Sequence, residues 1–148
     1  MRALIQRVSN ASVTIEHDTV AKIGRGFLIF VGAGIHDNET SCAKLWNKIR
    51  KLRIFADAQG KTNLDLETVE GSVLIVSQFT LFANCQRGNR PGFAEAADAA
   101  KGKYLYDFFV SLAKKDVPDV QTGQFGASMK VSLTNEGPFT IWLDTDSL

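Results

Sequence analysis

The chain has 148 residues, of which 45% are hydrophobic and 22% charged, and its 17 Lys and Arg residues nearly balance 16 Asp and Glu residues. A chain of this length buries roughly 70% of the surface that its unfolded form exposes, so one core can be built without metal or disulfide bonds. Normal apolar content with little net charge excludes low-complexity disorder. We therefore expect a single domain over residues 1–148.

The sequence predicts neither a membrane span nor secretion. The longest uninterrupted apolar run covers only residues 27–35, whereas a span needs about 20 residues. Gln6 and Arg7 stand where a signal peptide needs its apolar stretch. Cys42 and Cys85 are too few for a disulfide framework and are expected to remain thiols. These features predict a cytoplasmic protein.

The first part of the chain predicts three strands. Residues 3–15 alternate apolar and polar side chains, with a bend expected near Asn10, and residues 20–23 form a shorter strand. Residues 27–31 are a continuous apolar run, which is typical of a strand buried on both faces. Short turns join these segments, so we expect an opening meander of three strands.

A helix is predicted over residues 39–53. Asp37 or Asn38 supplies a side-chain oxygen for the free amides at its start. The apolar positions at helical spacing are Leu45, Trp46, Ile49 and Leu52. The basic positions are Lys44, Lys48, Arg50, Lys51 and Arg53. We interpret these cations as a solvated helix face, with a phosphate-facing patch as the alternative.

The rest of the chain predicts three more strands and a second helix. The strands cover residues 72–79, 129–133 and 139–143, and the last two flank a turn at 135–138. The alanine-rich residues 94–100 are expected to add a turn before the helix. The apolar face of that helix consists of Tyr104, Leu105, Phe108, Phe109 and Leu112. This order predicts an α+β domain whose two helices cover a largely antiparallel sheet.

Several chemistries lack the residues that they need. The histidines and cysteines are His17, His36, Cys42 and Cys85. They do not have the spacing of metal ligands, so we expect no metal site. The sequence also lacks the Gly-x-Ser-x-Gly motif, so it does not indicate a serine hydrolase. The Gly-Ala-Gly segment at 32–34 follows an apolar strand, but Asp37 replaces the third glycine of a dinucleotide fingerprint. We expect a strand-ending turn there and no cofactor.

Two polar segments at strand ends remain. Residues 77–81 read Ser-Gln-Phe-Thr-Leu, and residues 135–140 read Asn-Glu-Gly-Pro-Phe-Thr. Taken alone, the first suits a strand emerging into solvent and the second suits a hairpin turn.

Together, these two segments closely resemble the D-aminoacyl-tRNA deacylases, enzymes that hydrolyse D-amino acids from mischarged tRNA. The resemblance spans essentially the whole chain. The other matching segments are residues 4–8, 11–13, 53–55, 60–61, 90–91, 121–123 and 125–127, with Met129. It implies the fold of that family, with a barrel-like core in a homodimer, and no cofactor.

The resemblance also implies how substrate is selected. In this family the bond equivalent to Gly137–Pro138 is cis and reaches from one subunit into the pocket of the other. Its two carbonyls are thought to receive the amino group of the substrate and to leave no room for an L side chain. Asn135 belongs to the same motif. The partner implied is therefore the aminoacylated 3′ end of tRNA.

Catalysis is expected around the first segment. Backbone amides or side chains of Ser77, Gln78, Phe79 and Thr80 are the candidates for stabilising the oxyanion, at about 3 kcal/mol for each donor. Thr80 is a possible nucleophile, but an unassisted hydroxyl is weak at neutral pH. We favour hydrolysis assisted by the 2′-hydroxyl of the terminal ribose.

The roles expected of Met129, Phe79 and Arg7 each have an alternative. By resemblance, Met129 and Phe79 line the pocket around the adenine and aminoacyl group, although both could belong to the core. Arg7 is expected to brace the Gly-Pro segment, although an arginine within a strand can simply face solvent.

Other functions stay open. Removal of glycine from tRNA would accompany removal of D-amino acids. A related type of deacylase accepts certain L-amino acids through a trans Gly-Pro bond. A third alternative is a non-catalytic protein of the same fold that binds nucleic acid, including DNA.

Overall fold

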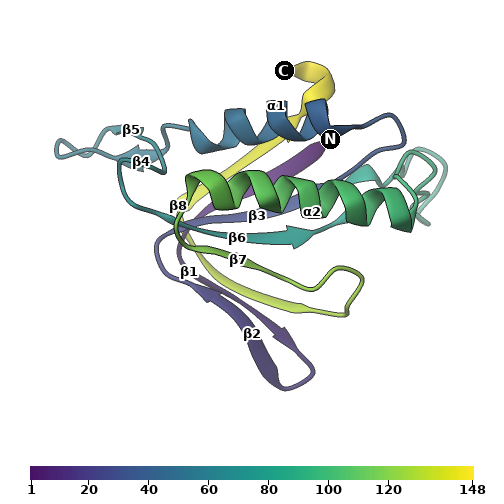
Figure 1. Ribbon diagram of the computed structural model, residues 1–148, viewed down its shortest axis with the longest axis horizontal. Coiled ribbons are helices and arrows are strands. Elements are labelled where there is room, and N and C mark those ends of the chain that lie inside the picture. The colour runs from purple at the N-terminus through teal and green to yellow at the C-terminus, as the bar shows by residue number, and fades with distance from the viewer.

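Two long strands, β1 (Arg2–Ile15) and β8 (Lys130–Asp144), organise the sheet in the computed structural model, which describes residues 1–148 (Figure 1). β1 pairs with β8 on one side, and on the other side it pairs with β3 (Gly26–Gly32) and then with β2 (Asp18–Ile23). All these pairs are antiparallel, and they confirm the three opening strands. The expected meander is wrong, because β2 and β3 both pair with β1 and not with each other. β1 therefore lies inside the sheet, whereas β8 has a strand on one side only.

The remaining strands join in parallel. β6 (Ser72–Ser77) pairs with β3, and β7 (Val120–Thr122) pairs with β6. The sheet curls until β2 lies beside β6 and β7, which gives a nearly closed barrel. The expected α+β fold with a barrel-like core is confirmed. The two parallel pairs and strand β7 were not predicted, because each parallel pair is connected through a helix and the strand has only 3 residues.

Helices α1 (Glu39–Arg50) and α2 (Ala99–Asp116) lie side by side against β3 and β6 (Figure 1). Asn38 caps α1 by accepting a hydrogen bond from the Ser41 amide at 3.1 Å. Asp98 caps α2, so the helical turn predicted over 94–100 is wrong for its first residues. A small hairpin of β4 (Phe55–Ala56) and β5 (Thr62–Leu64) follows α1. Neither helix is long and apolar enough to cross a membrane.

Tyr104 differs from its predicted place. Its side chain is 55% exposed and donates a hydrogen bond to Glu39 at 2.6 Å. Tyr106 is buried instead and donates to the Ile75 carbonyl at 2.9 Å. Helical spacing places Tyr104 close to the apolar stripe, but its position at the edge of α2 exposes it.

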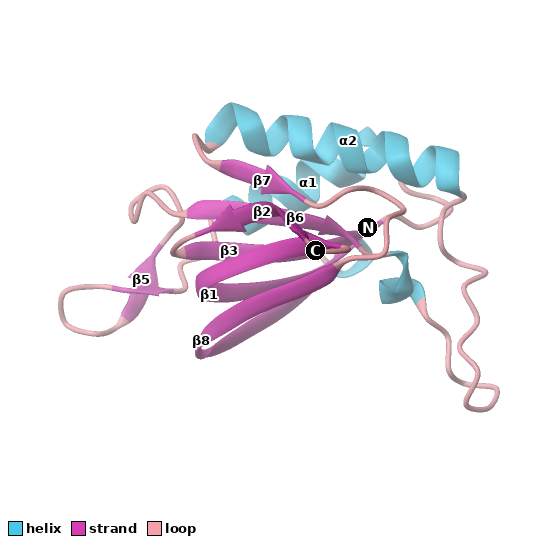
Figure 2. Cartoon of the chain, turned by 90° about the horizontal axis from the view of Figure 1, so that it is seen from below, coloured by secondary structure: helices cyan, strands magenta, loops and turns pink.

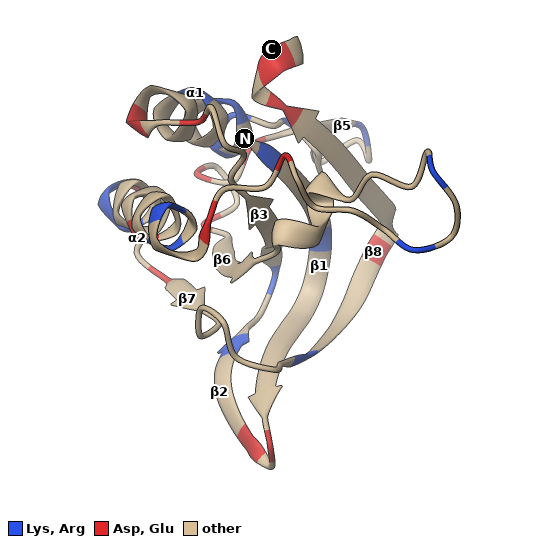
Figure 3. Ribbon diagram, turned by 90° about the vertical axis from the view of Figure 1, so that its right-hand side faces the viewer, with Lys and Arg blue, Asp and Glu red and all other residues tan.

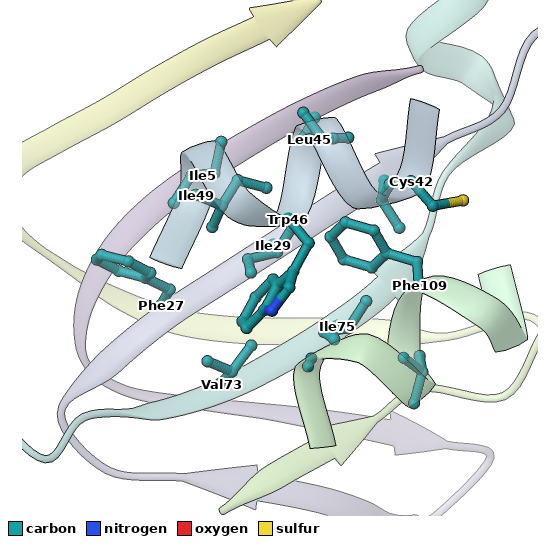
Figure 4. Packing of buried hydrophobic residues seen from close by; sticks show 14 of the residues in the cluster. Ile5, Phe27, Ile29, Cys42, Leu45, Trp46, Ile49, Val73, Ile75 and Phe109 are labelled. Atoms are coloured by element: carbon teal, nitrogen blue, oxygen red, sulfur yellow. The ribbon is translucent and has the colours of Figure 1, made fainter. Parts of the chain in front are cut away.

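The central strands are buried on both faces, as the run at 27–31 predicts. Phe27 and Ile29 face the helices, where the rings of Trp46 and Phe109 meet edge to face at 5.8 Å (Figure 4). Leu28 points the other way, into a second cluster enclosed by the curled sheet. This alternation separates two cores, one under the helices and one inside the barrel.

The hairpin expected at the end of the chain is wrong. Residues 130–144 form the single strand β8, and both of its halves pair with β1. Gln6 pairs with Thr140 and Val8 pairs with Asn135, so a step of two residues on β1 faces a step of five on β8. The extra residues bulge out of the ladder. We call residues 136–139 the β8 loop.

The two cysteines should differ sharply in reactivity. Cys42 is fully buried, and this burial, reinforced by the nearby Asp37 charge, raises the pKa of its thiol to about 12. Cys85 is a free thiol on the surface. Because the thiolate is the reactive form, we expect Ellman's reagent at about pH 8 to titrate one thiol in the folded protein and the second only in denaturant. Rapid reaction of both thiols in the folded protein would contradict this packing.

Candidate active site

A cavity of about 570 Å³ opens where β3 and β6 end. The last residues paired between these two strands are Val31 and Ser77, so both strands leave the sheet at the same level. The start of α2 and the segment after β7 form the opposite walls. The residues that line the cavity include Ser77, Gln78, Phe79, Tyr106, Phe125 and Met129.

Gly32 allows Gln78 to lie close to the end of β3. The Gln78 amide donates a hydrogen bond to the Val31 carbonyl at 2.8 Å. A Cβ atom added at Gly32 would lie 2.7 Å from the Gln78 carbonyl oxygen, closer than real contacts allow. The glycine expected merely to end a strand therefore sets the position of the segment at residues 77–81.

Only some of the proposed amide donors are free. Gln78 uses its amide in the bond to β3, whereas no loop or cap hydrogen bond uses the amides of Phe79 and Thr80. These two residues begin the short 3₁₀ helix η1 (Phe79–Phe82), whose first amides have no partner within the helix. The arrangement leaves two neighbouring donors, and Phe79, which carries the first, belongs to the cavity lining.

The Thr80 hydroxyl does not line the cavity. It is exposed and accepts a hydrogen bond from the Gln78 side-chain amide at 2.5 Å. An amide N–H cannot remove a proton from a hydroxyl, and neither His17 nor His36 lines the cavity. Thr80 thus has no base in contact with it.

Phe79 and Met129 form part of the cavity wall and are not in the fully buried core. The Phe79 ring is 55% exposed and meets the ring of Phe93 edge to face at 4.9 Å. Met129 covers Gly123, where an added Cβ would lie 2.6 Å from the sulfur. Both side chains therefore contribute apolar surface to the cavity.

Sequence reasoning missed two aromatic residues of the wall. The rings of Tyr106 and Phe125 lie 5.9 Å apart. Burial, and to a lesser degree the Asp107 charge, raises the pKa of Tyr106, so the phenol stays neutral and donates to the sheet. Phe125 lies in a segment that carries the family resemblance, which was the available signal. Tyr106 lies beside Leu105 in the helical pattern and had no distinguishing signal.

The second predicted motif forms a separate group around the β8 loop. Asn135 closes the base of the loop by donating to the carbonyls of Arg7 at 3.0 Å and Phe139 at 2.9 Å. Arg7 donates from Nε to the Glu136 carbonyl at 3.1 Å, and its guanidinium lies 4.9 Å from the centre of the Phe139 ring. The same guanidinium also donates to the Ile54 carbonyl. Arg7 thus ties the loop to the chain after α1.

At the tip of the loop, the Gly137–Pro138 bond is cis. Gly137 has φ +121°, and an added Cβ would lie 2.8 Å from Nη2 of Arg7. Both tip residues are exposed.

A single chain does not bring the two motifs together. None of Arg7, Asn135, Gly137 and Pro138 lines the cavity that Ser77, Gln78, Phe79 and Met129 help to form. No group of three or more His, Cys, Asp or Glu side chains is placed to hold a metal ion. The cavity therefore offers apolar walls, amides, hydroxyls and the Asp98 carboxylate, which accepts a hydrogen bond from the Lys101 amide at the start of α2.

Comparisons with known proteins confirm the resemblance. A family model described as D-Tyr-tRNA(Tyr) deacylase matches residues 4–144. The D-aminoacyl-tRNA deacylase of Lactobacillus gasseri is 54% identical over 145 residues, covering 97% of this chain and 99% of the relative. That of Thermotoga petrophila is 51% identical over 148 residues, covering 100% and 99%.

A solved structure described as c-Myc DNA Unwinding Element Binding Protein superposes with a TM-score of 0.92 at 35% identity, covering 97% of this chain and 98% of that one. The region matched by the family model includes the β3 and β6 ends and the whole β8 loop. The chain therefore belongs to the D-Tyr-tRNA(Tyr) deacylase family, hydrolases that act on the ester bond of aminoacyl-tRNA.

Proposed function

We propose that residues 1–148 form one deacylase domain that removes D-amino acids and glycine from tRNA in a cavity completed by a second copy of the chain. The observation that carries this proposal is the separation of the two motifs. The β8 loop is exposed at its tip and lies outside its own cavity, although both motifs belong to the family pattern. A loop from a partner would supply what the cavity lacks. A tRNA substrate also favours action in the cytoplasm.

The proposed reaction needs little from protein side chains. An aminoacyl ester is activated, so water must be oriented and the developing oxyanion stabilised. The amides of Phe79 and Thr80 are candidates for this stabilisation, at about 3 kcal/mol each. Since Thr80 lacks a base, the 2′-hydroxyl of the terminal ribose is the better candidate for activating water.

Chiral selection would come from the partner's β8 loop. The carbonyls of Gly137 and Pro138 would receive the amino group of the substrate, and the space beside them would be too small for an L side chain. Glycine has no side chain to exclude and would also be hydrolysed. Asn135 and Arg7 support this role by holding the loop in one geometry.

Features of β8 support a homodimer. Its outer edge has no strand partner, and unpaired edges readily pair with another chain. Trp142 lies on this strand opposite Leu4 and is 48% exposed. Tryptophan is enriched at protein–protein interfaces relative to the rest of the surface.

Paired tRNA substrates test the function directly. We expect the purified protein to hydrolyse D-tyrosyl-tRNA at least about 100-fold faster than L-tyrosyl-tRNA, because a steric clash prevents productive binding. Release of labelled tyrosine measures both rates, and glycyl-tRNA serves as the substrate without a side chain. Equal rates for the two enantiomers would refute chiral selection.

The Thr80→Ala variant separates the two catalytic hypotheses. We expect kcat to stay near the wild-type value, because the hydroxyl has no base. A substrate ending in 2′-deoxyadenosine should react on the order of 100-fold more slowly, since its assisting hydroxyl is missing. A folded Thr80→Ala protein without turnover, together with an acyl-enzyme trapped in the wild type, would establish a nucleophilic threonine instead.

Mixed dimers test whether the active site is shared. Ala127→Trp fills the cavity and Gly137→Val distorts the β8 loop, so each homodimer should be inactive. Mixing unfolded chains in equal amounts and refolding them should restore about a quarter of wild-type activity, because half of the dimers then hold one intact site. Light scattering checks that every sample is dimeric. No recovery in a folded mixed dimer would show that each chain uses its own loop.

DNA binding is a second candidate, favoured by the description of the solved structure that is 35% identical. Binding of duplex DNA at physiological salt, with D-aminoacyl-tRNA left intact, would favour it over hydrolysis. A DNA-binding role would need a more extensive basic surface than the charge balance of +4 over residues 1–60 implies, where nine Lys and Arg residues face five Asp and Glu residues.

A further inference from the structure

The chain contains seven arginines, and the fold uses five of them. Those five bind other parts of the chain through hydrogen bonds or aromatic rings: Arg2, Arg7, Arg25, Arg50 and Arg53. Arg87 and Arg90 make no side-chain hydrogen bond, ion pair or ring contact within the chain, and both are exposed. The two unused arginines lie three positions apart in one loop.

This loop is closed at its base. Asn84 and Gly92 exchange two backbone hydrogen bonds of 2.8 and 2.9 Å, and the Asn84 side chain accepts a further bond from the Gln86 amide at 2.9 Å. We call residues 84–92 the arginine loop. It projects from the body between η1 and α2 (Figure 2), and Figure 3 shows its basic residues far from those of the helices. The closed base holds the loop, and with it both cations, on one side of the molecule.

The arginine loop is attached to the wall of the cavity. Phe93 directly follows its base and meets the exposed ring of Phe79. A groove of about 350 Å³ beside the loop is lined by Asn84, Gln86, Arg87 and Arg90. Glu95 also lines it, and its carboxylate lies 3.9 Å from the Arg2 guanidinium. Amides and two free guanidinium groups thus lie next to the entrance of the cavity.

We propose that the arginine loop binds backbone phosphates of the tRNA strand that leads to the terminal adenosine in the cavity. This inference rests on the proposed function. A strand entering past Phe79 brings one phosphate per nucleotide, and guanidinium forks match phosphate oxygens well. With a net charge of only +1, the protein needs locally placed cations to attract RNA.

The basic run of α1 is the weaker location for such contacts. Arg50 and Arg53 bind Asn47 and Asn63, and Lys44 donates to the Thr145 carbonyl at 2.9 Å. Most of its cations are thus occupied within the chain, unlike those of the arginine loop.

Kinetics on two substrates test the proposal. In the Arg87→Gln/Arg90→Gln double variant, we expect KM for D-tyrosyl-tRNA to rise roughly fivefold for each arginine at 0.1 M salt, with the difference shrinking toward 1 M salt. The change in kcat/KM should be small for 3′-O-D-tyrosyladenosine, which lacks the preceding phosphates. Lys114→Gln/Lys115→Gln removes two cations from the end of α2 and is the matched control, with no rise expected.

Cys85 provides a second measurement within the arginine loop. Its exposed thiol can carry a maleimide-linked benzophenone, while buried Cys42 stays unlabelled. Irradiation with deacylated tRNA should give cross-links within the last few nucleotides of the 3′ strand. An unchanged salt dependence in the double variant, or cross-links elsewhere on the tRNA, would overturn the proposal. If the wild type hydrolyses neither substrate, the proposed function itself fails.

Discussion

The parallel pairing of β3 with β6 is the constraint on which the site depends. Both strands are buried on two faces, so their register is held by a core on each side. They end together at Val31 and Ser77, where the Gln78 amide bonds back to β3 and Gly32 leaves space for its carbonyl. The next amides, those of Phe79 and Thr80, donate to no loop or cap hydrogen bond within the chain. In the proposed reaction, backbone amides that stabilise the oxyanion need such a rigid support, because stabilisation requires donors already in position.

A mismatch in register between β1 and β8 produces the β8 loop, which carries the second segment of the family pattern. Because β1 continues through the sheet without a break, the extra residues of β8 must leave the ladder as the β8 loop. Asn135 then replaces the missing backbone pairs with side-chain bonds across the base of the loop. Arg7 contributes from the facing strand, which explains why a charged residue lies within β1. In the proposed dimer, this rigid loop would serve the neighbouring cavity.

The distribution of charge agrees with recognition of one end of an RNA. Near-neutral charge limits broad attraction to nucleic acid, and most arginines are used to hold the fold together. Free guanidinium groups remain beside the cavity, where a short strand would pass. Selection within the cavity would then depend on shape and backbone groups. The chain has few histidines and cysteines, which is consistent with the proposed function. Neither phosphate binding nor ester hydrolysis assisted by the substrate requires these residues.

The sequence by itself determined the α+β class, the double burial of residues 27–31, both helices and the family pattern in residues 77–81 and 135–140. These follow from local periodicity and from residue types at short spacing. Only the tertiary structure decided that β3 and β6 are parallel, that β8 is one strand, and that Tyr106 rather than Tyr104 is buried. It also decided which arginines are free. Strand pairing, cavity walls and the partners of a charge depend on contacts between residues distant in the chain, and local patterns carry no information about those contacts.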